Sequence, residues 1–287
     1  DYPRLFFDRA FIDGIQPALA GDGGLPSTAG MRQWLYVEDK AERAAALYTR
    51  LAANRGYWGS ALGQINADLD YWFPLWRQGH AASQWAPEME ELLSSRHLTD
   101  EQRRTLRAQL AAMACLASEP DYGPRGSMVH LGNPNMAIVR FMPLLYAAAL
   151  LPDHPRAAEW LDVMSQFVDY KLASNTGPDG GWSELFSYYD ASAPTLLHAA
   201  NILDRMGRLS PASRRLALDL AVLPLRFQSP EDPRFGFRAV PCWGHEGRAN
   251  FGQWLPAFRL AEGSDATLAA GLLWGWHQSA SFAGYHD

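Results

Sequence analysis

The sequence has few cysteines, little excess charge and no long apolar run. Cys115 and Cys242 are its two cysteines; they match no metal-ligand spacing and fit either one disulfide or two buried thiols. The 25 basic residues stand against 31 acidic ones, a formal net charge of -6, and no basic block occurs. This balance argues against a nucleic-acid partner. The absence of any apolar run of about 18 residues argues against a membrane partner.

Cofactor motifs are also missing. The sequence contains no His-Glu-x-x-His, no paired Cys-x-x-Cys and no glycine-rich phosphate loop. We therefore expect neither a metal nor another cofactor. The chain opens at Asp1 without a methionine or a signal-peptide pattern, which fits a processed export product or a trimmed chain. A periplasmic or secreted location is the expectation.

What the sequence does have is helical periodicity along most of its 287 residues. Thr99 and Gln102 form a capping-box pattern, which predicts the start of a helix there. Apolar residues then recur at helical spacing and predict its buried face, namely Leu106, Leu110, Met113 and Ala117.

Similar signals predict a series of helical hairpins. An apolar helix over 136–151 ends at a Pro-Asp turn, and a second helix follows with a stripe of apolar residues: Ala157, Trp160, Leu161, Met164, Phe167 and Val168. A helix over about 193–206 is closed by Gly207, and Ser210-Pro211 starts the next one, which carries Leu216, Leu220 and Leu223. Segments 251–260 and 264 onward predict a third pair of helices. Segments 39–56 and 60–76 predict an earlier pair. The fold class is therefore all-α.

Three long polar loops separate these helices, over 121–135, 175–191 and 228–250. Hairpins joined alternately by tight turns and long loops predict an incomplete (α/α) toroid, a single domain over 1–287, with the long loops at one rim. Loops of this length that are rich in aromatic residues are usually functional.

The first long loop offers hydrogen-bonding groups for an anionic or hydroxylated ligand: Arg125, His130, Asn133 and Asn135. The alternative is that its Asn-Pro-Asn run forms a turn or caps a helix.

The second loop contains "DGGWSELFSYYD". Glu184 is a candidate general acid or base, and Tyr188 or Tyr189 a candidate proton donor where nearby charge lowers its pKa. The alternative interpretation is structural: Trp182 and Phe186 pack, while Asp190 and Ser192 cap the next helix.

The third loop places Arg238, Trp243, His245, Glu246 and Arg248 close in sequence. Histidine transfers protons near neutral pH, and arginine neutralises a carboxylate with two parallel hydrogen bonds. A surface ion pair between the histidine and the glutamate is the alternative.

Three motifs together resemble the heparinase II/III-like polysaccharide lyases, including the related alginate lyases: "YPRLFFDRAFID", "GNPNM" and "PDGGWSELFSYYD". The resemblance implies an incomplete (α/α) toroid, usually followed by a β-sandwich domain, that cleaves a uronic-acid polymer by β-elimination. Stabilising the enolate charge is then the main catalytic demand. The chain ends without a β-rich region, so we expect either a fragment of a longer enzyme or a reduced relative.

By this resemblance, Asn133 neutralises the uronate carboxylate and Tyr189 is the first choice for the acid/base, with Tyr188 beside it. His245 is a looser catalytic candidate, and Pro134 stands where the family has a histidine. The expected partner is an acidic polysaccharide or oligosaccharide. The expected substrate-binding residues are Arg125, His130, Asn135, Trp182, Glu184, Arg238, Trp243 and Arg248.

Other functions stay open. A glycoside hydrolase would use Glu184 with a second carboxylate, such as Asp179, Asp190 or Glu246. A glycan-binding protein without activity would use the aromatic rim: Trp182, Tyr188, Tyr189 and Trp243. A terpenoid cyclase or prenyltransferase ranks last, because "DGGW" and "GQW" are faint matches and an aspartate-rich motif is missing.

Overall fold

The computed structural model describes residues 5, 39–52, 85–118, 134–184, 186–234, 236, 238–239 and 254–278. Most of these residues are helical. No strand occurs among them, and an isolated antiparallel bridge joins Thr176 and Trp182. The predicted all-α class is confirmed.

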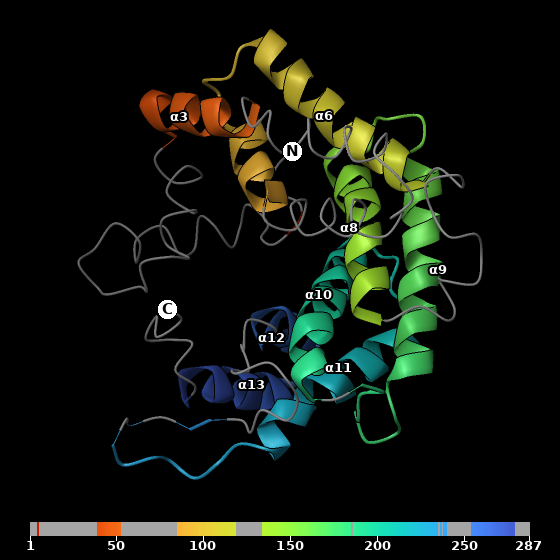
Figure 1. Ribbon diagram of the computed structural model, residues 1–287, viewed down its shortest axis with the longest axis vertical. Coiled ribbons are helices and arrows are strands. Elements are labelled where there is room, and N and C mark those ends of the chain that lie inside the picture. The colour runs from red at the N-terminus through yellow and green to blue at the C-terminus, as the bar shows by residue number, and fades with distance from the viewer. Residues whose placement is uncertain are drawn as a thin grey trace, which may run out of the picture. The chain divides into compact units, whose positions relative to one another are not determined.

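The chain divides into two compact units, Asp1–Met164 and Ser165–Asp287, and the boundary falls inside α9 (Ala157–Asn175). The first unit contains α3 (Ala41–Ala52), helical residues 85–94, α6 (Asp100–Ser118) and α8 (Pro134–Leu150). Within it, α6 packs against both α3 and α8 (Figure 1). The single domain expected over 1–287 stays a prediction.

The second unit contains α10 (Phe186–Arg205), α11 (Pro211–Arg226), α12 (Trp254–Glu262) and α13 (Ala266–Gln278). In this unit α10 contacts α11 and α12, and α12 packs along α13. The last two helices are the third pair that the periodicity predicts.

The predicted capping box of α6 is confirmed. The Thr99 amide donates to Gln102 Oε1 at 2.9 Å, and the Gln102 amide donates to Thr99 Oγ1 at 3.1 Å. The predicted apolar face is buried as a whole, with Leu106, Leu110, Met113 and Ala117 all in the core. Local capping and periodicity therefore agree on this helix.

The turn between α10 and α11 also follows its sequence signals. Gly207 has a left-handed φ of 68°, and the Arg208 amide donates to the Leu203 carbonyl at 2.8 Å, which closes α10. Ser210 then caps α11 by accepting a hydrogen bond from the Ser213 amide at 3.1 Å. On α11, Leu220 and Leu223 are buried and Leu216 is half-buried.

The start of α10 differs from the prediction. The helix begins at Phe186, so Tyr188 and Tyr189 lie in its first turn and not in a loop that continues to 191. Asp190 and Ser192 therefore lie inside the helix, and the interpretation of them as its caps is wrong. Tyr189 is 1% exposed, and its burial against the core stabilises a turn that no local cap signal marks.

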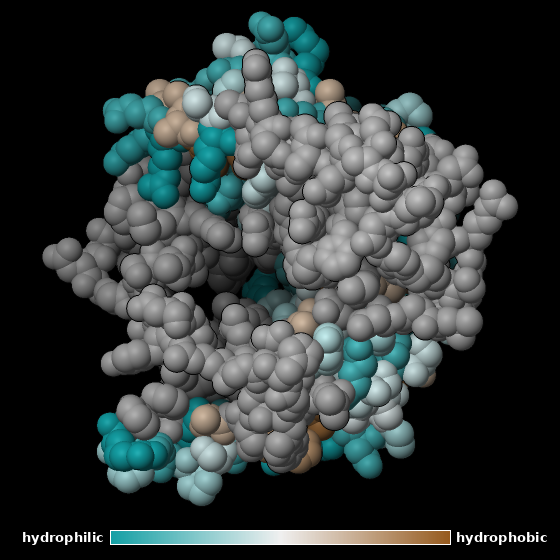
Figure 2. Space-filling model, viewed as in Figure 1, coloured by the Kyte–Doolittle hydropathy of each residue, from teal (hydrophilic) through white to brown (hydrophobic). Residues whose placement is uncertain are grey.

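The described atoms on the face shown in Figure 2 are mostly hydrophilic, with hydrophobic atoms in small, scattered groups. Three large apolar side chains are exposed in the described ranges, Val163, Phe227 and Trp274. None of the helices described is both long and apolar enough to cross a membrane. The same ranges contain no group of three metal-ligating side chains.

Candidate functional site

The connection between α9 and α10, residues 176–184, is a tight turn that presents Trp182 and Glu184. The Gly177 amide donates to the Gly181 carbonyl at 2.7 Å, and the Ser183 amide donates to the Asn175 carbonyl at 3.0 Å. Together with the bridge between Thr176 and Trp182, these bonds return the chain across the end of α9. Most of the loop is thus held by its own backbone.

Gly180 fixes this turn against α11. Its φ is 77°, which disfavours side-chain-bearing residues, and a Cβ built on it would overlap the backbone carbonyl of Asp219. Arg226, at the end of α11, donates from Nη1 to the Asp179 carbonyl. The glycine is therefore required both by its backbone conformation and by the close approach of α11.

Glu184 is the carboxyl group at the centre of the candidate site. Its Oε2 accepts a hydrogen bond from Trp182 Nε1 at 3.1 Å and another from Ser192 Oγ at 3.2 Å. The side chain is half-buried. Burial raises the pKa of Glu184, and the two hydrogen bonds offset part of this rise because they favour the charged form.

Lys171 supplies the opposite charge. It lies on α9, is 1% exposed, and its Nζ is 5.9 Å from the ring centre of Phe167 and 5.8 Å from that of Tyr170. Burial lowers the pKa of Lys171, and attraction to Glu184 partly restores it. We refer to Lys171, Trp182, Glu184 and Ser192 as the Glu184 cluster.

Sequence reasoning missed Lys171. A signal was available, because Lys171 lies between the buried residues Val168 and Leu172 on α9, where a lysine is rarely buried without an opposite charge. The missing information was which acid it faces. Glu184 lies beyond the end of the helix, and only the fold of the turn brings the two charges near each other.

The two adjacent tyrosines have different surroundings. Tyr189 is buried, and its hydroxyl donates to the backbone carbonyl of Leu220 on α11 at 2.9 Å. Tyr188 is half-buried. Successive residues of a helix point about 100° apart, so the two rings cannot face the same place. Tyr189 thus joins α10 to α11, whereas Tyr188 retains exposed surface.

Arg238 is the other predicted site residue with a described side chain. Its Nη1 donates to the Ser229 carbonyl at 3.1 Å, and its guanidinium carbon lies 5.6 Å from the ring centre of Trp274. These contacts stabilise the segment after α11. The structure does not bring Arg238 into contact with the Glu184 cluster in the ranges it describes.

The remaining predicted residues lie outside the described part of the chain, or their side chains do. Pro134 is described: it is buried and is the first residue of α8, a position that favours proline. Cys115 on α6 is half-buried. The predicted residues that fall outside are Arg125, His130, Asn133, Cys242, Trp243, His245, Glu246 and Arg248, with the side chains of Asn135 and Asp190.

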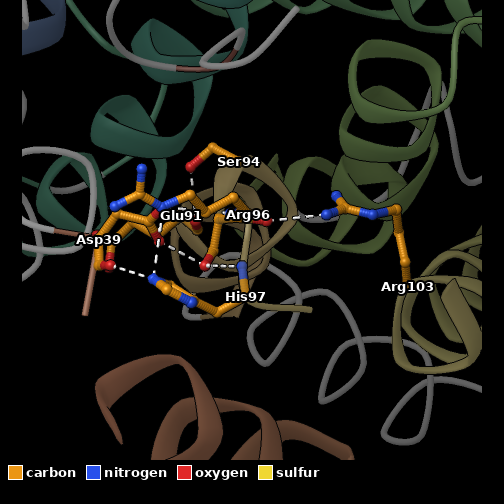
Figure 3. A network of polar contacts seen from close by, with 7 residues as sticks. Asp39, Glu91, Ser94, Arg96, His97 and Arg103 are labelled. Atoms are coloured by element: carbon orange, nitrogen blue, oxygen red, sulfur yellow. Dashed lines mark hydrogen bonds and ion pairs between the residues drawn. The ribbon is translucent and has the colours of Figure 1, made fainter. Parts of the chain in front are cut away.

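A second polar network lies in the first unit, around Asp39 (Figure 3). Asp39 Oδ1 accepts from Ser95 Oγ at 2.6 Å, and its backbone carbonyl is 2.6 Å from His97 Nε2. The serine hydroxyl donates to the carboxylate and accepts from the His97 backbone amide at 3.2 Å, so it does not bond to the imidazole as a nucleophilic serine would. Arg103 donates from Nη2 to the Ser95 carbonyl at 2.8 Å, and the network ties the start of α3 to the end of helical residues 85–94.

Comparison with known proteins adds no relative. No family model matches the chain, and neither the curated proteins nor the solved structures provide a match. What is established is the class, a predominantly helical protein with a half-buried glutamate that accepts a hydrogen bond from a tryptophan and attracts a buried lysine. Its function has to be argued from these residues.

Proposed function

We propose that the protein is a carbohydrate-active enzyme, a lyase that cleaves a uronic-acid-containing polysaccharide by β-elimination on an incomplete (α/α) toroid. One observation carries the proposal. A single short segment holds a half-buried carboxyl group of raised pKa, a half-buried tryptophan that donates to it, and a half-buried tyrosine in the first turn of α10: Glu184, Trp182 and Tyr188. Aromatic faces bind sugar rings, and acids of raised pKa transfer protons at neutral pH.

The geometry favours Tyr188 over Tyr189 as the proton donor to the departing glycosidic oxygen. The Tyr189 hydroxyl donates to the Leu220 carbonyl, and that bond would have to break before the group could serve a substrate. Tyr188 lies on a different side of α10 and is more exposed. In this proposal Asn133 neutralises the uronate carboxylate, as the resemblance implies, and His245 is the base that takes the C5 proton. A C4–C5 double bond then forms as the bond from C4 to the glycosidic oxygen breaks, and Tyr188 protonates that oxygen.

A glycoside hydrolase is the second candidate, because the raised pKa of Glu184 also suits a general acid. Such an enzyme needs a second carboxylate near the first. The charged group that the described residues bring to Glu184 is the ammonium of Lys171.

The test is incubation with alginate, hyaluronan, heparan sulfate and ulvan, followed by ultraviolet absorbance and reducing-end assays. A lyase creates a 4,5-unsaturated uronate that absorbs in the near ultraviolet. New reducing ends without this absorbance would support the hydrolase and overturn the lyase. Binding without any turnover would support a glycan-binding protein.

Substitution of the adjacent tyrosines then tests the site. Tyr188→Phe should reduce turnover by roughly 10²-fold or more, the scale for losing a positioned acid/base. Tyr189→Phe is the matched control and should retain most of the activity at temperatures where it is folded. If Tyr188→Phe has a rate near wild type and Tyr189→Phe loses most of its activity, then Tyr189 is the acid/base, as the sequence predicts.

A further inference from the structure

Helix α8 buries one charged side chain in an otherwise uncharged helix. Its sequence, PNMAIVRFMPLLYAAAL, contains Arg140 as the single ionisable cation. Between Ala137 and Leu150 every side chain is buried except Phe141, which is half-buried. Arg140 itself is 7% exposed, and its guanidinium carbon lies 5.0 Å from the ring centre of Phe141.

Arg140 has no acid to balance its charge among the residues that the structure describes. Burial lowers the pKa of Arg140 to about 10, and no carboxylate among the described residues raises it again. Its Nε is buried without a hydrogen-bond partner. Because this pKa is still well above neutral pH, the side chain is a buried cation under ordinary conditions.

Other arginines of the chain show how a shielded guanidinium is normally satisfied. Arg214 donates to the Leu260 carbonyl at 2.7 Å and pairs with Asp204. Arg103 donates to the carbonyls of Leu93 and Ser95. Buried charges in proteins are normally paired, because an unpaired one is strongly unfavourable, and a bound anion would supply the partner that the described residues do not give Arg140.

We propose that Arg140 is the anchor of an anion-binding site, and that its ligand presents a singly charged oxyanion, a carboxylate in the first instance. The planar guanidinium matches the two oxygens of a carboxylate and binds them through parallel hydrogen bonds. One cation in apolar surroundings balances one negative charge. A doubly charged phosphate would leave a net charge buried, which is costly where the dielectric constant is low.

The binding test compares wild type with Arg140→Met, which keeps an unbranched apolar stem and removes the guanidinium group with its charge. Glucuronate should raise the melting temperature of wild type at an ionic strength matched with sodium chloride, and Arg140→Met should weaken this binding at least about tenfold. Methyl sulfate, a singly charged tetrahedral oxyanion, should stabilise wild type more than phosphate at pH 8 does. Arg215→Met is the matched control, because Arg215 is 80% exposed and pairs with Asp219 on its own helix.

A stability measurement separates this site from an internal ion pair. Removing an uncompensated buried cation relieves an unfavourable burial, so Arg140→Met without ligand should be as stable as wild type or more stable. Arg214→Met should be less stable, because it leaves Asp204 without its partner. Destabilised Arg140→Met with unchanged glucuronate binding would overturn the proposal. The outcome is independent of the lyase assay, since binding can be lost whether or not any polymer is cleaved.

Discussion

Polar groups have opposite surroundings in two regions of the molecule. One region is the connection between α9 and α10, and the other is the buried helix α8. In the connection, Glu184 accepts two hydrogen bonds and attracts Lys171, and backbone groups bond within the turn. In α8, the guanidinium of Arg140 is buried with its Nε unpartnered. Both regions place a charged group in shielded surroundings, but among the residues that the structure describes only the first one also supplies opposite charge.

This difference separates structural from ligand-dependent polar groups. A group whose partners lie in the fold contributes to stability, and removing it leaves those partners unsatisfied. A buried charge without partners reduces stability until a ligand binds, so its removal should weaken binding and leave the unliganded protein as stable as before or more stable. Substitutions in the connection and its supports test the first half of this comparison, and the Arg140 experiments test the second.

The largest effect is expected at Gly180. Gly180→Ala combines a φ of 77° with an overlap between the new Cβ and the Asp219 carbonyl, and we expect a loss of about 3 kcal/mol in the free energy of unfolding. Gly181→Ala is the matched control, because a Cβ there meets nothing within 4 Å. Urea unfolding of both variants measures the difference. Equal stability of the two would mean that the connection is not held against α11.

Tyr189→Phe should have a smaller effect. It removes the hydroxyl that donates to the Leu220 carbonyl at 2.9 Å and leaves this buried oxygen unsatisfied. We expect a loss of about 1–2 kcal/mol in the free energy of unfolding. Tyr48→Phe, at a half-buried position on α3, should change it by less than about 0.5 kcal/mol. If the two losses are similar, the Tyr189 hydroxyl does not join α10 to α11.

The parts of the fold that the sequence predicts correctly are those with local signals. The capping box at Thr99, the closing glycine at 207 and the Ser-Pro start of α11 each act within a few residues, so their pattern can be read directly. The start of α10 could not be predicted in this way. Its first turn is stabilised by the contact of Tyr189 with α11, which lies 31 residues further on.

The candidate site follows the same division. Glu184, Trp182 and Tyr188 stand out because polar and aromatic residues gather around two glycines. Lys171 and Arg140 did not stand out, because each lies in a stretch that otherwise predicts a plain core helix. A charge on a buried helical face is the signal that would have identified both.

The smallest effect is the pH dependence that Glu184 gives to stability. Because burial raises the pKa of Glu184, the folded protein holds this proton more tightly than the unfolded chain does, so stability is lost as pH rises through the folded pKa. Glu184→Gln cannot ionise and should gain stability relative to wild type between pH 4 and pH 8, by less than about 1 kcal/mol because solvent screens a half-exposed group. Lys171→Met should instead make the pH dependence of stability stronger. It removes the attraction that lowers the pKa of Glu184, so the loss of stability with rising pH becomes steeper and extends to higher pH. Urea unfolding of the three proteins across this range measures both effects, and a difference between Glu184→Gln and wild type that stays constant or shrinks would show that Glu184 is not shielded in the fold.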